Sequence, residues 1–293
     1  ADSYGDRLLV GEVFDNDAAL AASYHGHDND ELHLAFNFEL LFQPWNAGAF
    51  AEAARRWYRL LPIGAWPNFT LSNHDQPRHA SRYGGGSCGE ARARVAATML
   101  LTVKGTPFLY YGEELGMRNR RIPRHAIQDP LGRRTWPLPI GRDGARTPMQ
   151  WSAERNAGFS DDTPWLPVHP DFESRNVTLQ QRSENSLLTF YRRLLELRRQ
   201  YPALESGEIT FVPGANRGRT RRGARKLPAP AVGKHVLAYF RHTSEELLLI
   251  CLNFVGRRQL IDGPGATAAL PIPELSGPLP FTPDIDTTVE VLF

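Results

Sequence analysis

The sequence predicts an α/β unit organised around a parallel sheet, followed by a smaller antiparallel all-β domain. Up to about residue 112, short apolar segments alternate with amphipathic helical ones, which is typical of βαβ units. After residue 207 the pattern changes to short strands alone. We therefore divide the chain into residues 1–203 and residues 204–293. Hydrophobic residues make up 41% and charged residues 23% of the 293 positions, so the chain can bury a globular core.

The first two strands are expected from two different patterns. Residues 7–10 contain the compact apolar run Leu8-Leu9-Val10, which predicts a buried strand that ends just before Glu12. From Leu32 to Leu40, apolar residues alternate with more polar ones, which is the period-two pattern of a strand.

The remaining elements follow from helical spacing and from short apolar runs. Helices are expected at 49–61, 90–104 and 185–200. Further strands are expected at 68–71, 106–111, 209–212, 235–240, 247–254 and 287–293. Residues 113–184 lack clear periodicity and are rich in Pro, Gly, Arg and Trp. Loops this long inside a compact protein are usually functional.

Charge and cysteine content exclude several classes of protein. The 34 basic and 32 acidic residues leave a net charge of +2, which is too small to indicate a nucleic-acid partner. A basic run at 216–226 has no aromatic residues within it, so we interpret it as a solvated loop. Cys88 and Cys251 indicate neither a disulfide framework nor a zinc site. With no apolar run of about 20 residues and no signal pattern, we expect a cytoplasmic protein without a membrane partner.

Acidic residues directly follow two of the expected strands. Glu12 follows the strand expected at residues 7–10. Asp75 lies in the polar stretch Ser72-Asn73-His74-Asp75, which follows the strand expected at residues 68–71. In α/β barrels, chemistry is carried at the carboxyl ends of strands. Cleavage of a glycosidic bond with retention needs two carboxyl groups about 5 Å apart. Taken alone, the two residues are also compatible with structural capping or ion pairing.

Four segments, in order, extend this interpretation. Residues 9–14 (LVGEVF) and 70–78 (TLSNHDQPR) closely resemble two motifs of the α-amylase superfamily, glycoside hydrolase family 13. Residues 104–117 look like the last barrel strand of that family. Residues 128–130 and 141–151 (GRDGARTPMQW) resemble the loop of its α-glucosidase and oligo-1,6-glucosidase branch. The resemblance implies half of a TIM (β/α)8 barrel over residues 1–203 and a small antiparallel β-sandwich over residues 204–293.

The same resemblance assigns roles to individual residues. Glu12 matches the general acid/base, and Asp75 matches the carboxylate that stabilises the transition state. His74 and Arg142 match groups that bind the sugar at the cleaved position. Phe14 follows the acid and is expected either to line the pocket or to pack in the core.

Other residues are weaker candidates. Arg78 and Arg82 are expected either to face the leaving group or to form ion pairs, and Tyr110 and Tyr111 to pack in the barrel. Tyr24, His25, His27 and Asp28 are interpreted as a polar loop surface. We therefore expect no metal and no cofactor.

The nucleophile of the family, an Asp in a motif of the type Asp-x-x-Arg-x-Asp, has no match in this sequence. The resemblance thus implies the C-terminal half of the enzyme, lacking the first four barrel strands and inactive by itself. The expected activity of the complete enzyme is hydrolysis of α-glucosidic bonds in short oligosaccharides or disaccharides. Two alternatives remain open: a transglycosylase of the sucrose isomerase or trehalose synthase type, and a non-catalytic relative.

Overall fold

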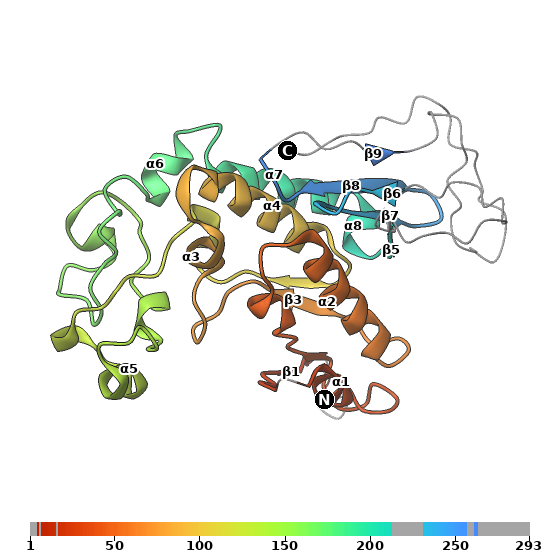
Figure 1. Ribbon diagram of the computed structural model, residues 1–293, viewed down its shortest axis with the longest axis horizontal. Helices are drawn as coiled ribbons and strands as arrows, with labels where there is room; N and C mark the ends of the chain where they lie inside the picture. Colours follow the sequence, from red (N-terminus) through yellow and green to blue (C-terminus); the bar gives the residue numbers. More distant parts are fainter. Residues whose placement is uncertain (1–4, 6, 16, 213–230, 257–260, 263–293) are drawn as a thin grey trace.

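A computed structural model describes residues 5, 7–15, 17–212, 231–256 and 261–262. Figure 1 shows two short parallel strand pairs flanked by helices, and an antiparallel sheet that packs beside helices α2 and α4. Strand β1 (Val10–Gly11) pairs with β2 (Leu34–Ala35), and β3 (Asn68–Thr70) pairs with β4 (Thr106–Phe108). Both pairings are parallel, which confirms the parallel pairing expected of the α/β part.

Helices separate these strands along the chain. Helix α1 (Ala18–Ser23) lies between β1 and β2, and α2 (Ala47–Leu60) lies between β2 and β3. The connection from β3 to β4 contains α3 (His79–Tyr83), the 3₁₀ turn η3 (Gly86–Cys88) and α4 (Gly89–Thr102). This order of strands and helices is the βαβ organisation expected from the sequence.

Capping groups and apolar faces explain the long helices. The side chain of Asn46 accepts a hydrogen bond from the Ala49 amide and starts α2, whose buried face includes Phe50 and Trp57. Ser186 caps helix α7 (Leu187–Gln200) in the same way. Helices α2, α4 and α7 begin and end within two residues of the bounds expected for them. The predicted helices are therefore confirmed.

Strand β2 is much shorter than the predicted strand from Leu32 to Leu40. After Ala35 the chain leaves the strand, and residues Glu39–Phe42 form the 3₁₀ turn η2. The side chain of Asn37 accepts a hydrogen bond from the Glu39 amide at 2.9 Å, which competes with strand pairing. The alternating apolar residues from Leu32 to Leu40 therefore form a short strand followed by a turn, and not one long strand.

Strand β1 is exposed, and this corrects the expectation of a buried strand at residues 7–10. The exposed fractions of Leu8, Leu9 and Val10 are 64%, 41% and 40%. An interior strand of a parallel sheet is covered by neighbours on both sides, whereas β1 has β2 as its sole strand partner among the described residues.

The segment from 113 to 184 consists of turns and short helices. It contains η4 (Glu113–Leu115), η5 (Arg124–Ala126), α5 (Pro130–Thr135), η6 (Asp143–Ala145), η7 (Arg155–Gly158) and α6 (Val177–Gln181). Figure 1 shows it as an extension that projects from one side of the molecule, with α5 at its tip. In the part of the chain that the structure describes, no helix is both long and apolar enough to cross a membrane.

The antiparallel sheet follows α7 and the short helix α8 (Pro202–Glu205). Its strands are β5 (Glu208–Phe211), β7 (Val236–His242) and β8 (Leu247–Asn253), in the order β5-β7-β8. A second antiparallel pair joins β6 (Ala231–Val232) to β9 (Ile261–Asp262). The strand predicted at 287–293 and the basic run at 216–226 lie outside the described residues, and the sandwich stays a prediction.

One hydrophobic core joins the two parts of the chain. Trp57 and Phe69 from the α/β part belong to the same buried cluster as Tyr239 and Leu252 from the antiparallel sheet. The boundary expected between residues 203 and 204 falls inside α8. The division into two domains is thus still a prediction, but the two parts pack as one body across α2, α4 and β7.

Candidate active site

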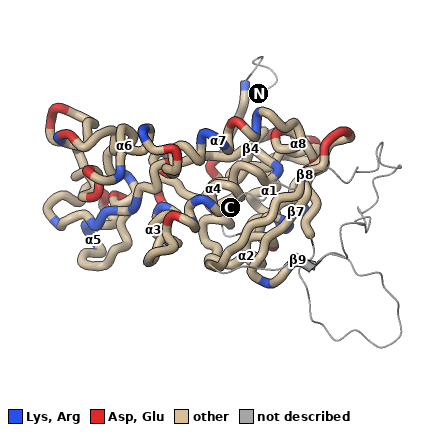
Figure 2. Tube along the Cα trace, turned by 90° about the horizontal axis from the view of Figure 1, so that it is seen from above, with Lys and Arg blue, Asp and Glu red and all other residues tan. Residues whose placement is uncertain are grey.

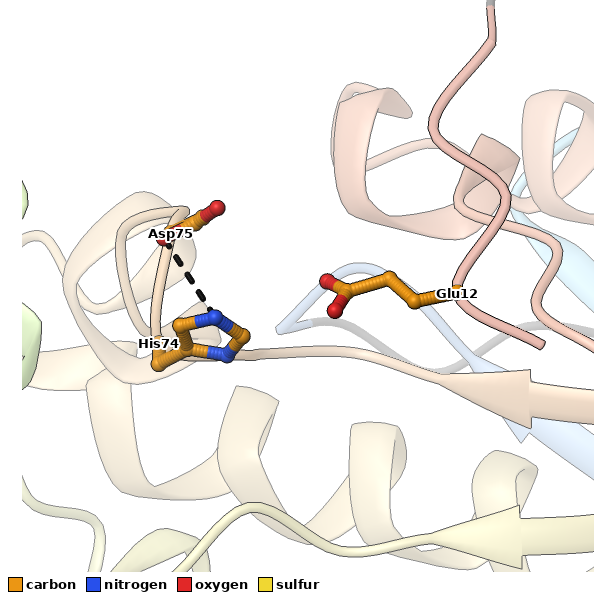
Figure 3. Close-up of side chains that lie close together, drawn as sticks. All are labelled: Glu12, His74 and Asp75. Carbon is orange, nitrogen blue, oxygen red and sulfur yellow. Dashed lines mark ion pairs between the residues drawn. The ribbon is translucent and has the colours of Figure 1, made fainter. Parts of the chain in front are cut away.

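The structure brings together three of the residues singled out in the sequence. Glu12 directly follows β1, whereas His74 and Asp75 lie in the loop after β3. One ligand atom of each residue lies within 4.8 Å of those of the other two. Figure 3 shows the Glu12 carboxylate pointing toward the His74 ring, with Asp75 beyond it. The carboxyl ends of two different strand pairs therefore supply one polar cluster.

The loop that carries His74 and Asp75 is shaped by an asparagine. The Asn73 side-chain oxygen accepts hydrogen bonds from the amides of Asp75 at 3.0 Å and Gln76 at 2.7 Å. Such side-chain-to-backbone bonds stabilise a turn directly after a strand. The turn places two consecutive functional side chains at the end of β3.

Asp75 is surrounded by basic groups. Its Oδ1 atom lies 2.6 Å from Arg146 Nη2, 3.4 Å from Arg142 Nη1 and 3.5 Å from His74 Nε2. The Asp75 side chain is about one-third exposed, so it can still reach a bound ligand. These contacts fix the position of the Asp75 carboxylate between the loop after β3 and the segment that carries Arg142 and Arg146.

A second, buried carboxylate anchors Arg142. Asp129 Oδ1 accepts a hydrogen bond from Arg142 Nη2 at 2.9 Å, and Asp129 Oδ2 accepts one from the Arg142 amide at 2.9 Å. Burial alone would raise the pKa of Asp129, but the hydrogen bonds and charge of Arg142 outweigh it and lower that pKa to about 2. Figure 2 shows both acidic and basic positions around α5.

The loop around Arg142 is held in shape by hydrogen bonds from backbone amides to the Asp143 side chain and by the close approach of two glycines. Asp143 Oδ2 accepts hydrogen bonds from the amides of Gln128 at 2.6 Å and Asp129 at 2.9 Å. Gly141 approaches Gly132 so closely that an added Cβ would lie 2.8 Å from the Gly132 Cα. A side chain at position 141 would therefore displace the segment that holds Asp129.

Arg146 is a site residue that sequence reasoning missed. Its Nη2 makes the shortest ion pair to Asp75, and its Nε donates to the His74 carbonyl oxygen at 2.8 Å. It lies four residues after Arg142 in the same motif, GRDGARTPMQW. The sequence contained the signal, since the motif holds two arginines, but only one was selected.

Phe14 is itself exposed and lies beside the buried Phe38 and the exposed Phe42. Its side chain is 59% exposed, and its ring centroid lies 5.8 Å from that of Phe38 and 6.3 Å from that of Phe42. Of the two roles expected for Phe14, the structure excludes core packing within the described chain.

Glu12 is exposed, as His74 is, but among the described residues its carboxylate lacks the charged contacts that surround Asp75. Within the described ranges it has no hydrogen bond or ion pair, although its carboxylate faces the His74–Asp75 pair. The environment that a general acid needs, with water excluded, is therefore not provided around Glu12 by these residues.

The weaker arginine candidates have structural roles. Arg78 is buried, contacts the rings of both Tyr110 and Tyr111, and donates to the Tyr111 carbonyl oxygen. Arg82 donates to the backbone oxygens of Pro77 and Leu71. Neither forms an ion pair among the described residues, which corrects the expectation of ion pairing, whereas a place facing the leaving group stays a prediction.

The tyrosines expected to pack in the barrel also bind the following loop. Tyr111 is partly exposed, and its hydroxyl donates to the Thr147 carbonyl oxygen at 2.6 Å. The Tyr110 hydroxyl donates to the carbonyl oxygen of Ala145 at 3.2 Å. Together they fix the segment that carries Arg142 and Arg146.

Two groups of residues contain side chains of the types that ligate metal ions. In the loop containing Tyr24, His27 and Asp28, His25 is buried, which corrects its interpretation as surface. Burial lowers the pKa of His25 and favours the neutral ring. In the described part of the chain, the donor cluster close enough for a metal is Glu12, His74 and Asp75. Glu12 and His74 are exposed, and the interpretation above gives all three residues a role without a metal. The expectation of no metal therefore stays a prediction.

Comparison with known proteins gives a family match over most of the chain. Residues 1–207 match the α-amylase family, described as alpha amylase, catalytic domain. A probable α-glucosidase of Rhizobium meliloti is 39% identical over 214 residues, covering 72% of this chain and 39% of the relative. A probable oligo-1,6-glucosidase of Bacillus subtilis is 31% identical over 293 residues, covering 89% of this chain and 49% of the relative.

Solved structures agree with the sequence comparisons. The α-glucosyl transfer enzyme XgtA superposes with a TM-score of 0.73 at 32% identity, covering 86% of this chain and 44% of that one. The chain thus spans about half the length, or less, of the relatives that it matches.

Proposed function

The chain belongs to the α-amylase family, in its α-glucosidase and oligo-1,6-glucosidase branch, and on this premise we propose that it supplies half the active site of a retaining α-glucosidase. The substrates are short oligosaccharides or disaccharides with α-glucosidic bonds. The observation that carries the proposal is the convergence of Glu12, His74 and Asp75 from the ends of two strand pairs.

In this mechanism Glu12 is the acid and then the base. The Glu12 carboxyl gives its proton to the glycosidic oxygen while the bond from that oxygen to the anomeric carbon breaks and the nucleophile forms an ester with the same carbon. Water then attacks the anomeric carbon, Glu12 takes a proton from that water, and the nucleophile leaves as a carboxylate. The configuration of the sugar is retained because two displacements have occurred.

Asp75, His74 and Arg142 bind the sugar that is being cleaved. The ionised Asp75 accepts hydrogen bonds from sugar hydroxyls, and these strengthen as positive charge develops on the ring. His74 hydrogen-bonds the same ring. Arg142, fixed by the buried Asp129, offers donors in a rigid planar arrangement.

The nucleophile belongs to a segment that packs on β1. In support, Leu8, Leu9 and Val10 form an exposed apolar run that leads into strand β1, and such an edge is normally covered by another strand or element. The family barrel closes by pairing strands on both sides. Below, "complete enzyme" means this chain joined to the segment that supplies the nucleophile.

The first experiment is to sequence the coding region upstream of the codon for Ala1. An in-frame segment with an Asp-x-x-Arg-x-Asp strand would support the proposal and identify the complete enzyme. A start codon directly before Ala1 without such a segment would contradict it, because the chain would then lack a nucleophile. In that case a binding function would be tested instead.

The second experiment compares Glu12→Gln with Glu31→Gln in the complete enzyme. Because Gln cannot transfer a proton, kcat should fall by about 10²–10⁴-fold in Glu12→Gln. Glu31 is an exposed glutamate, and its replacement should leave kcat unchanged. Full activity in Glu12→Gln would refute the acid/base role and leave the non-catalytic alternative or another acid.

Transfer of the glucosyl unit to a sugar acceptor, including rearrangement of sucrose or maltose, is the second candidate activity. Two observations favour it: XgtA is named as an α-glucosyl transfer enzyme, and Phe14, which follows Glu12 closely in sequence, forms an exposed ring pair with Phe42. Chromatography of products from sucrose and maltose separates the two activities. Free glucose supports hydrolysis, and a rearranged disaccharide supports transfer.

A cytoplasmic location completes the proposal. Cell fractionation followed by immunoblotting would test it, and recovery of the protein in an extracellular or membrane fraction would contradict it.

A further inference from the structure

A buried pair of titratable groups lies behind the site and takes no part in the mechanism above. His79 begins α3 and Glu113 begins η4, and each side chain is 1% exposed. His79 Nδ1 lies 3.5 Å from Glu113 Oε1. The pair therefore joins the segment after β3 to the segment after β4.

His79 also closes the loop that carries the site residues. The Ser72 hydroxyl accepts a hydrogen bond from the His79 amide at 2.9 Å, and its Oγ lies 3.2 Å from His79 Nδ1. Ser72 is held in turn, because the Thr70 hydroxyl donates to its carbonyl oxygen at 2.8 Å. Ser72 and His79 thus hold together the two ends of residues 73–78, which include His74 and Asp75.

The burial of Glu113 gives this arrangement an energetic consequence. Neither carboxylate oxygen of Glu113 has a hydrogen bond among the described residues, and His79 is its ion-pair partner. A buried carboxylate is costly unless it is paired. If His79 were removed, Glu113 would lose that partner, and the chain around it would have to move to reach water or another donor.

We infer that His79 is a positioning residue that, through Ser72 and Glu113, holds residues 73–78 in the conformation that turns His74 and Asp75 toward Glu12. The functional part of this inference rests on the proposed glucosidase site. The structural part, that His79 orders the loop, does not.

Hydrogen exchange of the full chain tests the structural part without any assay of activity. The amides of Asp75 and Gln76 are bonded to Asn73, so they should exchange slowly in the wild type. In His79→Ala they should exchange at least about tenfold faster, because the loop opens locally. His79→Asn places an amide where Nδ1 lies and should restore slow exchange. His27→Ala, at an exposed histidine, is the matched control.

Wild-type exchange at Asp75 and Gln76 in His79→Ala would overturn the inference. If His79→Ala does not fold, Glu113→Gln replaces it, since Gln keeps the size of the side chain and removes its charge. Faster exchange at the same two amides in Glu113→Gln supports the inference, and wild-type exchange overturns it.

Kinetics of the complete enzyme test the functional part. Since displacement of a catalytic group by about 1 Å costs about 10²-fold in rate, His79→Ala should lower kcat by about 10–100-fold with little change in KM, and His79→Asn should recover most of the loss. An inactive wild-type enzyme would refute the proposed function and leave the exchange result standing. An active wild type with unchanged kcat in His79→Ala would refute the functional role of His79.

Discussion

The two sides of the candidate site are built very differently. Asp75 lies in a loop whose backbone is fixed by Asn73, and its carboxylate contacts Arg142, Arg146 and His74. Glu12 follows a two-residue strand and, within the described chain, has neither a hydrogen bond nor an ion pair. One side is held by charged contacts from two loops, and the other is held by the backbone alone.

This difference shows which part of the site the chain completes by itself. Around Asp75 the partners come from residues 74–146 and are all present, so the geometry is fixed before any ligand binds. Around Glu12 the neighbouring strand is exposed, so water has access to the acid. We expect the Asp75 side to be preorganised, and the Glu12 side to become so when another segment covers β1.

Apart from Glu12→Gln, the largest expected effect comes from a substitution on the preorganised side. Asp75→Asn should lower kcat of the complete enzyme by about 10²–10³-fold, because the amide cannot stabilise the positive charge of the transition state. Steady-state kinetics on maltose would measure this. Asp28→Asn, at an exposed aspartate, should have wild-type kcat. A normal rate in Asp75→Asn would mean that the better-ordered side is not the catalytic one.

Arg146→Lys should have the next largest effect. Lysine keeps the charge but cannot bond both the His74 carbonyl oxygen and the Asp75 carboxylate as a guanidinium does. We expect kcat/KM to fall by about tenfold, which corresponds to about 1.4 kcal/mol. Arg155→Lys, at an exposed arginine in η7, provides the comparison. Equal kcat/KM values in Arg146→Lys and Arg155→Lys would show that Arg146 has no role in substrate binding or catalysis.

The Asp129–Arg142 contact should give a pH-dependent contribution to stability. The pKa of Asp129 is lowered from 3.8 to about 2 in the folded chain, so the folded state favours the ionised form. The contribution should be complete above about pH 4 and should decrease as the pH falls toward about 2. The free energies of unfolding of wild type and Asp129→Asn, measured by denaturant titration, should converge over that range. A difference that does not depend on pH in this window would contradict the assignment.

The smallest expected effect on the stability of this chain is at Leu8, two residues before the exposed strand β1. Leu8→Glu should change the free energy of unfolding of this chain by less than about 0.5 kcal/mol, because Leu8 is 64% exposed. The same change should prevent activity of the complete enzyme if β1 is covered there by another strand. A large loss of stability in the isolated chain would show that β1 is already packed.

Much of the fold could be predicted from the sequence because the signals were local. Apolar residues at helical spacing placed α2 and α7 within two residues of their observed bounds. The predicted strand from Leu32 to Leu40 was wrong beyond Ala35, because a side-chain bond from Asn37 ends it. This hydrogen bond depends on the single residue Asn37. The alternation of apolar residues, from which the strand was predicted, is the same with or without it.

The site was predicted in part for a similar reason. Glu12, His74, Asp75 and Arg142 were selected by motif, and the structure places all four in one region. Arg146 was missed, and Arg78 and Arg82 were expected to face the leaving group or to form ion pairs, whereas Arg78 is buried and both donate to backbone oxygens. Whether an arginine reaches a carboxylate, a carbonyl oxygen or solvent depends on segments distant in sequence, which a local pattern does not contain.

The sequence by itself determined the order of helices and strands, the family, and the residues expected to do chemistry. These follow from periodicity and from short motifs, which depend on neighbouring residues. Only the tertiary structure decided that Arg146 joins Asp75, that His79 and Glu113 are buried together, and that β1 is exposed. Each of these features depends on whether segments far apart in the sequence lie in contact. Burial and electrostatic interactions depend on distance in space, so a local sequence pattern does not contain them.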